Sequence, residues 1–100
     1  MEKSIQEKLP LIVASFKKNG AISAYIFGSA ATATMNKDSD VDFIFSFPLD
    51  LHYEVYSDNY FNLVHELESI LNKNVDLVAE KTLKNPYLIE KINSQKIQIL

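Results

Sequence analysis

Apolar residues recur at helical spacing in three stretches of the chain and form short, nearly continuous runs in three others. The helical stretches are residues 2–18, 58–71 and 85–94. The continuous runs are rich in β-branched and aromatic side chains, which is typical of strands, and they are residues 22–27, 40–47 and 75–78. Pro10 lies inside the first helical stretch, so we expect a kink or two short helices there.

Weaker signals fill the connections between these elements. The small side chains of residues 30–34 predict a short helix, and residues 49–57 are either a loop or briefly helical. The apolar tail at residues 97–100 predicts a last short strand or a contact surface for a partner. Helices and strands therefore alternate, which predicts the α/β (α+β) class, with helices packed on a small sheet.

The clearest helix, residues 58–71, carries one apolar stripe that should face the core. The stripe consists of Phe61, Val64, Leu67 and Leu71. We expect Ser57 or Asp58 to cap this helix at its N-terminus, because their side-chain oxygens can accept from free backbone amides.

Composition bounds the class of protein. Of 100 residues, 47% are hydrophobic and 23% are charged, which is an ordinary globular balance and predicts one domain over residues 1–100. The absence of cysteine excludes disulfide scaffolds and thiolate metal sites. No apolar run approaches the ~20 residues that span a membrane, and residues 1–4 lack a signal-peptide core, so we expect no membrane association and a cytoplasmic location.

All ten basic residues are lysine, and the net charge is −3. Without arginine the chain cannot form bidentate guanidinium contacts to guanine or phosphate, so specific DNA binding is not expected. Any phosphate contact must come from lysine, backbone amides, hydroxyls or a metal ion.

Three aspartates lie on or beside apolar strands. Asp40 and Asp42 are two residues apart, so on a strand they point to the same side, opposite to Val41 and Phe43. Asp76 interrupts an apolar run, and it joins the pair if the two strands are neighbours. Clustered carboxylates repel one another unless a cation binds between them, and Mg²⁺ prefers oxygen ligands. This set predicts a metal site for phosphoryl or nucleotidyl transfer, in which two ions hold the attacking and leaving oxygens.

Gly28 and Ser29 follow a predicted strand and precede a predicted short helix. Glycine allows a ligand to approach the backbone closely, and the serine hydroxyl adds a donor, so this bend is a candidate phosphate loop. Taken alone, Gly-Ser is usually a turn and Asp-x-Asp is common by chance; the two together, in this order, favour the catalytic interpretation. A calcium-loop interpretation fails because Phe43 stands where glycine is needed and Leu49 where glutamate is needed.

These motifs resemble the minimal nucleotidyltransferases of the polymerase-β-like superfamily. The matching residues are Gly28-Ser29, then Ser39-Asp40-Val41-Asp42, then Asp76. The resemblance implies a mixed sheet with flanking helices and Mg²⁺-dependent transfer of a nucleoside monophosphate, with ATP as the expected substrate. It implies that Asp40 and Asp42 hold two metal ions, and that Gly28 and Ser29 hold the β and γ phosphates. Asp76 would be a metal ligand and the base for the attacking hydroxyl.

The same resemblance points to a partner protein. Small members are similar to antitoxins paired with HEPN-type toxins, and some adenylylate a tyrosine of the toxin. The chain departs from the family where Ala31-Thr32-Ala33 replaces the frequent Ala-Arg-Gly, and Lys37 is predicted as the substitute charge. Ser39 and Lys37 complete the predicted nucleotide-binding set. Inhibition by binding alone, transfer to a small molecule, and a homo-oligomer stay open as alternatives.

Overall fold

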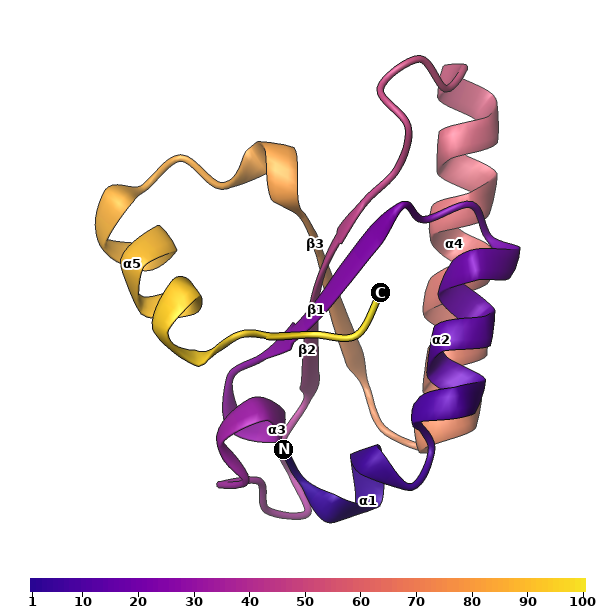
Figure 1. The fold of residues 1–100 in the computed structure, drawn as a ribbon. Coiled ribbons are helices and arrows are strands. Elements are labelled where there is room, and N and C mark those ends of the chain that lie inside the picture. Colours follow the sequence, from indigo (N-terminus) through magenta and orange to yellow (C-terminus); the bar gives the residue numbers. More distant parts are fainter.

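A four-stranded mixed sheet forms the centre of the computed structural model, which describes residues 1–100 (Figure 1). The strands are β1 (Ser23–Phe27), β2 (Val41–Ser46), β3 (Val75–Ala79) and β4 (Ile97–Gln98). The helices are α1 (Lys3–Gln6), α2 (Leu9–Lys18), α3 (Ser29–Thr32), α4 (Tyr53–Leu71) and α5 (Pro86–Gln95), with a 3₁₀ turn, η1 (Glu80–Thr82), after β3. The predicted class and the mixed sheet are confirmed.

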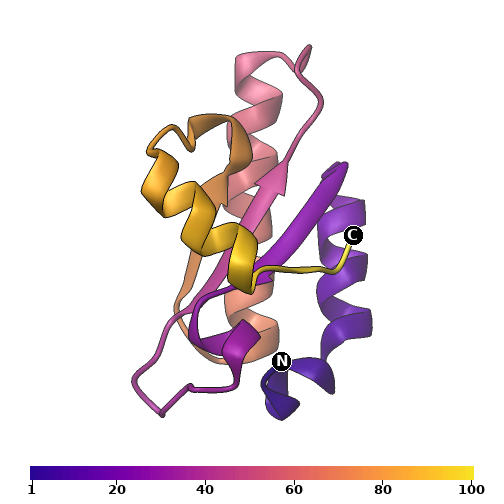
Figure 2. The ribbon, with the colours of Figure 1, turned by 60° about the vertical axis from the view of Figure 1, so that its left-hand side comes forward.

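The strands lie in the order β3-β2-β1-β4, with β2 parallel to β3 and β1 antiparallel to both β2 and β4. Helices cover both faces of this sheet. Helices α2 and α4 lie side by side against one face, and α5 lies across the other (Figures 1 and 2). No helix is both long enough and apolar enough to cross a membrane.

The core lies between the sheet and the α2–α4 pair. Its largest fully buried side chains include Phe16, Phe43, Phe45, Ile12, Ile26, Leu63 and Leu67. Phe16 of α2 meets Phe43 of β2 edge to face, with ring centroids 5.4 Å apart, which is a favoured geometry for aromatic pairs. Because Val41, Phe43 and Phe45 point into this core, alternate residues of β2 point to the opposite face, as the sequence predicts.

One polar cluster ties α2 to α4 beside this core. Glu66 of α4 accepts from the hydroxyl of Ser15 at 2.7 Å, from the amide of Asn19 at 3.1 Å and from the ammonium of Lys18 at 2.9 Å. Ser15 and Asn19 are themselves buried, so Glu66 satisfies donors that water does not reach.

Two expectations about α4 are wrong. The helix begins at Tyr53, because the Nδ1 atom of His52, rather than Ser57 or Asp58, accepts from the backbone amide of Glu54 at 3.3 Å and caps it. Phe61 is 57% exposed, because the buried stripe runs through Leu63, Leu67 and Leu71 and turns Phe61 toward solvent. The only aromatic ring that the Phe61 ring contacts is that of Tyr60, in an edge-to-face arrangement.

The other element predictions hold to within a few residues. Pro10 divides the first stretch into α1 and α2 and lies in the first turn of α2, where its missing N–H costs nothing. The first strand starts one residue late, and Ile22 is 63% exposed. The short helix and the tail strand form as α3 and β4.

Candidate active site

Asp42 and Asp76 face each other across neighbouring strands. In the parallel ladder of β2 and β3, Asp42 is the register partner of Asp76, so both side chains leave the same face of the sheet. Asp40 lies two residues before Asp42 and directly before β2. The sequence could place these three acids on one face only if β3 paired beside β2, and it does.

The acids lie on the face opposite to the α2–α4 core. Asp40 and Asp76 are exposed and Asp42 is half-buried, so an incoming ligand can reach all three. Burial raises the pKa of the Asp42 carboxyl above its ordinary value, and the neighbouring charges of Asp76 and Asp40 raise it further. The one ion pair of the chain joins Lys18 to Glu66, elsewhere in the fold, so no lysine neutralises this acidic group.

Gly28 lies directly against Asp42. Its backbone has φ +68° and ψ −150°, a conformation that is nearly restricted to glycine. A Cβ added at Gly28 would lie 2.6 Å from Oδ2 of Asp42. The bend between β1 and α3 therefore lies close to the acid of β2, and this brings the predicted phosphate loop and the predicted metal ligands to one place.

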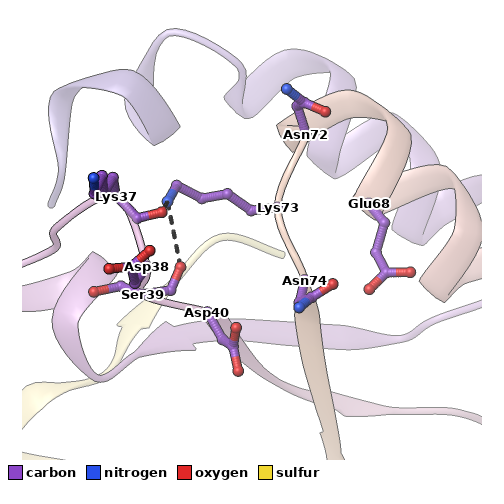
Figure 3. Close-up of a pocket in the computed structure, with 8 residues that line it drawn as sticks. All are labelled: Lys37, Asp38, Ser39, Asp40, Glu68, Asn72, Lys73 and Asn74. Carbon is purple, nitrogen blue, oxygen red and sulfur yellow. Dashed lines mark hydrogen bonds between the residues drawn. The ribbon is translucent and has the colours of Figure 1, made fainter.

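Polar residues surround an open cavity of about 500 Å³ on the Asp40 side of the site (Figure 3). They are Lys37, Asp38, Ser39, Asp40, Glu68, Asn72, Lys73 and Asn74. The sequence analysis missed Lys73, whose ammonium donates to the backbone oxygens of Asn36 at 3.3 Å, Lys37 at 3.1 Å and Ser39 at 3.3 Å. Its position after the helix-ending Asn72 was the available signal, since a lysine there can reach a neighbouring loop.

Ser39 and Lys37 belong to this cavity. The hydroxyl of Ser39 accepts from the backbone amide of Asn36 at 3.0 Å, which closes the turn before Asp40. Figure 3 shows the Asp40 carboxylate below this turn, across from Glu68 of α4. Lys37 lines this cavity together with Asp40.

Gly28 and Ser29 line a second open cavity, of about 290 Å³, between α3 and α5. The other polar residues around it are Thr32, Thr34, Lys91 and Gln95. Lys37 is not among them and lines the first cavity instead. The sequence analysis missed Lys91 and Gln95, although Leu88, Lys91, Ile92 and Gln95 share one helix face and Ile92 is buried.

The acids fit a hard divalent cation by chemistry. All the donors are carboxylate oxygens, and they carry uncompensated negative charge. The structure contains no group of three or more His, Cys, Asp or Glu side chains already arranged to hold a metal ion. Mg²⁺ is commonly held by one or two carboxylates together with substrate phosphates, so Asp40 and Asp42 are the residues that would hold it.

Comparison with known families gives the class of this chain. Residues 11–100 match the family model described as "Polymerase beta, Nucleotidyltransferase". The chain belongs to this nucleotidyltransferase family. A protein of Methanocaldococcus jannaschii named "Putative protein adenylyltransferase MJ1379" is 34% identical over 77 residues, which cover 77% of this chain and 75% of that protein.

Solved structures share the fold. A structure described as a "putative minimal nucleotidyltransferase" aligns with a TM-score of 0.74 and 26% identity, covering 97% of this chain and 95% of that one. A toxin–antitoxin structure with AMP-PNP aligns with a TM-score of 0.71 and 23% identity over 92% of this chain and 72% of that one. A Shewanella oneidensis complex of a tri-AMPylated HEPN toxin with its MNT antitoxin aligns at 0.64 and 22% identity, covering 95% of this chain and 71% of that one. The resemblance to minimal nucleotidyltransferases inferred from the motifs is confirmed.

Proposed function

We propose that this chain is a Mg²⁺-dependent nucleotidyltransferase that transfers AMP from ATP to a hydroxyl group of a partner protein. The observation that carries the proposal is the arrangement of Asp42, which pairs in register with Asp76 and lies against Gly28. This arrangement joins a cation-attracting group of acids to a bend that leaves room for a phosphate. Membership of the nucleotidyltransferase family and the adenylyltransferase name of the M. jannaschii relative support the same reaction.

In the proposed reaction, a hydroxyl oxygen of the acceptor attacks the α-phosphorus of ATP. A bond forms between that oxygen and the α-phosphorus, the bond from the α-phosphorus to the bridging oxygen of the β-phosphate breaks, and pyrophosphate leaves. Asp76 takes the hydroxyl proton; it is exposed on the edge strand β3, where an acceptor from another chain can approach. Gly28 and Ser29 hold the β and γ phosphates.

Asp40 and Asp42 would hold Mg²⁺. When bound, two such ions supply positive charge to the attacking and leaving oxygens. Ser39 fixes the turn that leads into Asp40, and Lys73 anchors the backbone of the same turn. The role of these two residues is to position the Asp40 carboxylate.

We propose a HEPN-type toxin as the partner protein, with a toxin tyrosine as the acceptor. Support comes from the fold, which aligns with a HEPN toxin–MNT antitoxin complex in which the toxin is AMPylated. The open position of Asp76 suits a large acceptor better than an enclosed small one. The expected outcome of transfer is a silenced toxin.

The test mixes the purified chain with the protein of the adjacent gene, ATP labelled on the α-phosphate, and Mg²⁺. Label should appear on the partner and disappear when Mg²⁺ is removed with a chelator. Asp42→Asn should abolish labelling, while Asp50→Asn, an exposed acid remote from the site, should leave it unchanged. Labelling that persists in Asp42→Asn would contradict the proposed site.

A second candidate function is inhibition by binding alone. The lack of arginine and of a ready-made three-ligand cluster favours it, because both weaken the case for strong nucleotide and metal binding. In that case the chain should inhibit the toxin without nucleotide, and Asp40→Asn should inhibit equally well. Transfer to a small acceptor without any partner protein would contradict both candidates.

A further inference from the structure

A nucleoside triphosphate needs a positive partner in this site. Its phosphates would lie beside three carboxylates, none of which is paired with a lysine. Gly28 and Ser29 are neutral, and the chain has no arginine. A lysine close to the Gly28–Ser29 bend is therefore the available side-chain cation.

Lys91 is the one cationic side chain of the cavity that Gly28 and Ser29 line. It comes from α5, on the far wall, with Gln95 one helical turn later. Ile92 is 4% exposed and packs α5 onto the molecule, which fixes the direction in which its neighbour Lys91 leaves the helix. The Gly28–Ser29 bend and Lys91 thus line opposite walls of one open cavity of about 290 Å³.

Hydroxyl groups form the near wall of this cavity. Thr32 donates from Oγ1 to the backbone oxygen of Gly28 at 3.2 Å, and its Oγ1 lies 2.9 Å from Oγ1 of Thr34. The Ser29 side chain makes no hydrogen bond within the protein, nor does the Lys91 ammonium, so both are free to bind a ligand. The cavity therefore combines the Lys91 cation, the Gln95 amide and the free hydroxyl of Ser29, which is a donor set for phosphate oxygens.

Lys37 occupies a different place. It lines the cavity of Asp38, Asp40 and Lys73, and it does not line the cavity of Gly28 and Ser29. Lys37 therefore shares a cavity with Asp40, whereas Lys91 is the lysine that shares a cavity with the Gly28–Ser29 bend.

We propose that Lys91 binds the β and γ phosphates of the nucleoside triphosphate, with Gln95 beside it. The assignment rests on the proposed function, since it concerns the nucleotide of that same site. It also predicts a specificity: ATP and ADP should depend on Lys91, and AMP should not, because AMP lacks the phosphates that reach the cavity. Helix α5, which follows the third acid in the chain, then becomes part of the nucleotide site.

The experiment measures equilibrium binding of ATP, ADP and AMP, each with Mg²⁺, by titration calorimetry. Lys91→Met should weaken ATP binding about tenfold, a change expected for loss of one ammonium–phosphate contact, and leave AMP binding unchanged. Lys91→Arg should restore ATP binding because it keeps the charge. Lys17→Met, at an exposed position of α2 remote from the site, is the matched control. If Lys91→Met unfolds, Lys91→Gln repeats the comparison.

Three results separate this inference from the proposed function. Suppose that the wild-type protein binds ATP but labels no partner, and that Lys91→Met binds ATP more weakly than the wild type does. The inference then stands and the transferase proposal fails. If transfer occurs and Lys91→Met binds ATP as tightly as wild type, or if Lys37→Met alone weakens ATP binding, the inference is overturned. If ATP and AMP weaken equally in Lys91→Met, the role is structural and the inference is also overturned.

Discussion

The carboxylate of Asp42 occupies the space that a side chain on Gly28 would need. The distance of 2.6 Å from an added Cβ to Oδ2 of Asp42 is shorter than any real contact of such atoms. The aspartate side chain is short, so it can yield only by turning away from its present direction. The bend after β1 and the acid of β2 are therefore coupled, and a side chain at position 28 would displace the Asp42 carboxylate.

Gly28→Ala should abolish nucleotide transfer. The Cβ would displace the Asp42 carboxylate, and the backbone conformation at this position costs a non-glycine residue about 1–3 kcal/mol. The matched control is Gly20→Ala, which also has positive φ (+85°) but whose Cβ would meet only the Asn59 amide, at 3.5 Å. Both variants should lose thermal stability, and only Gly28→Ala should lose activity. Equal activity in the two variants would show that the contact with Asp42 is irrelevant.

Asp42→Asn should not destabilise the metal-free protein at neutral pH. Asp42 is half-buried beside the charges of Asp76 and Asp40, so the substitution removes repulsion and the cost of burying a charge. Mg²⁺ should raise the melting temperature of the wild type, since a ligand that binds only the native state stabilises it, and should raise that of the variant less. Thermal denaturation with and without Mg²⁺ measures both. A large drop in stability of the metal-free variant would indicate a structural role for Asp42.

Lys73→Met should loosen the turn before Asp40. The substitution removes three ammonium–carbonyl hydrogen bonds, to Asn36, Lys37 and Ser39. We expect a loss of about 1 kcal/mol of unfolding free energy. Amide hydrogen exchange should become faster at residues 36–41 and stay unchanged in α2. Lys84→Met, an exposed lysine without such contacts, should change neither quantity.

Glu66→Gln should weaken the protein in a pH-dependent way. Hydrogen bonds from Lys18, then Ser15, lower the pKa of the Glu66 carboxyl below its ordinary value of 4.5. A lowered pKa in the folded state means that ionised Glu66 stabilises the fold above pH 4.5 and that this contribution is lost as the pH falls through the folded-state value.

The expected difference from wild type at pH 7 is about 1 kcal/mol or less, since the side chain of Glu66 is 31% exposed and that of Lys18 is 71% exposed. Denaturant unfolding at several pH values measures it. Glu7→Gln, at an exposed position outside any ion pair, supplies the control for a simple change in charge. A difference that persists unchanged well below pH 4.5 would rule out the ionised form as the cause.

The sequence predicted the site best where local pattern and chemistry coincide. Asp40, Asp42 and Asp76 stand out because a carboxylate in an apolar strand is costly unless it is solvated, paired or bound to a metal ion, and alternation along a strand fixes its face. The pairing of β2 with β3 could not be predicted from local pattern, since strand order depends on contacts between distant segments. The motif resemblance supplied the family, and with it the mixed sheet.

The failures have physical causes as well. Phe61 fits a helical stripe with Leu67 and Leu71, but so does Leu63, and only the packing of α4 on the sheet buries Leu63 and leaves Phe61 exposed. The His52 cap was missed because histidine is not a usual N-cap residue. Lys91 was missed because its position depends on how α5 folds back over the Gly28–Ser29 bend, which no local pattern reports.

The ladder between β2 and β3 also constrains how this chain can vary. Asn72, Lys73 and Asn74 are the only residues between α4 and β3, and the backbone oxygen of Asn74 accepts from the amide of Val41 at 3.0 Å. Deleting one of them would slide β3 by one position, turning Leu77 outward and Asp76 into the hydrophobic interior. Insertions or deletions in this connector should therefore be selected against, even though it is a surface loop. Among related chains, the length of the connector should indicate an intact site better than its amino-acid sequence does.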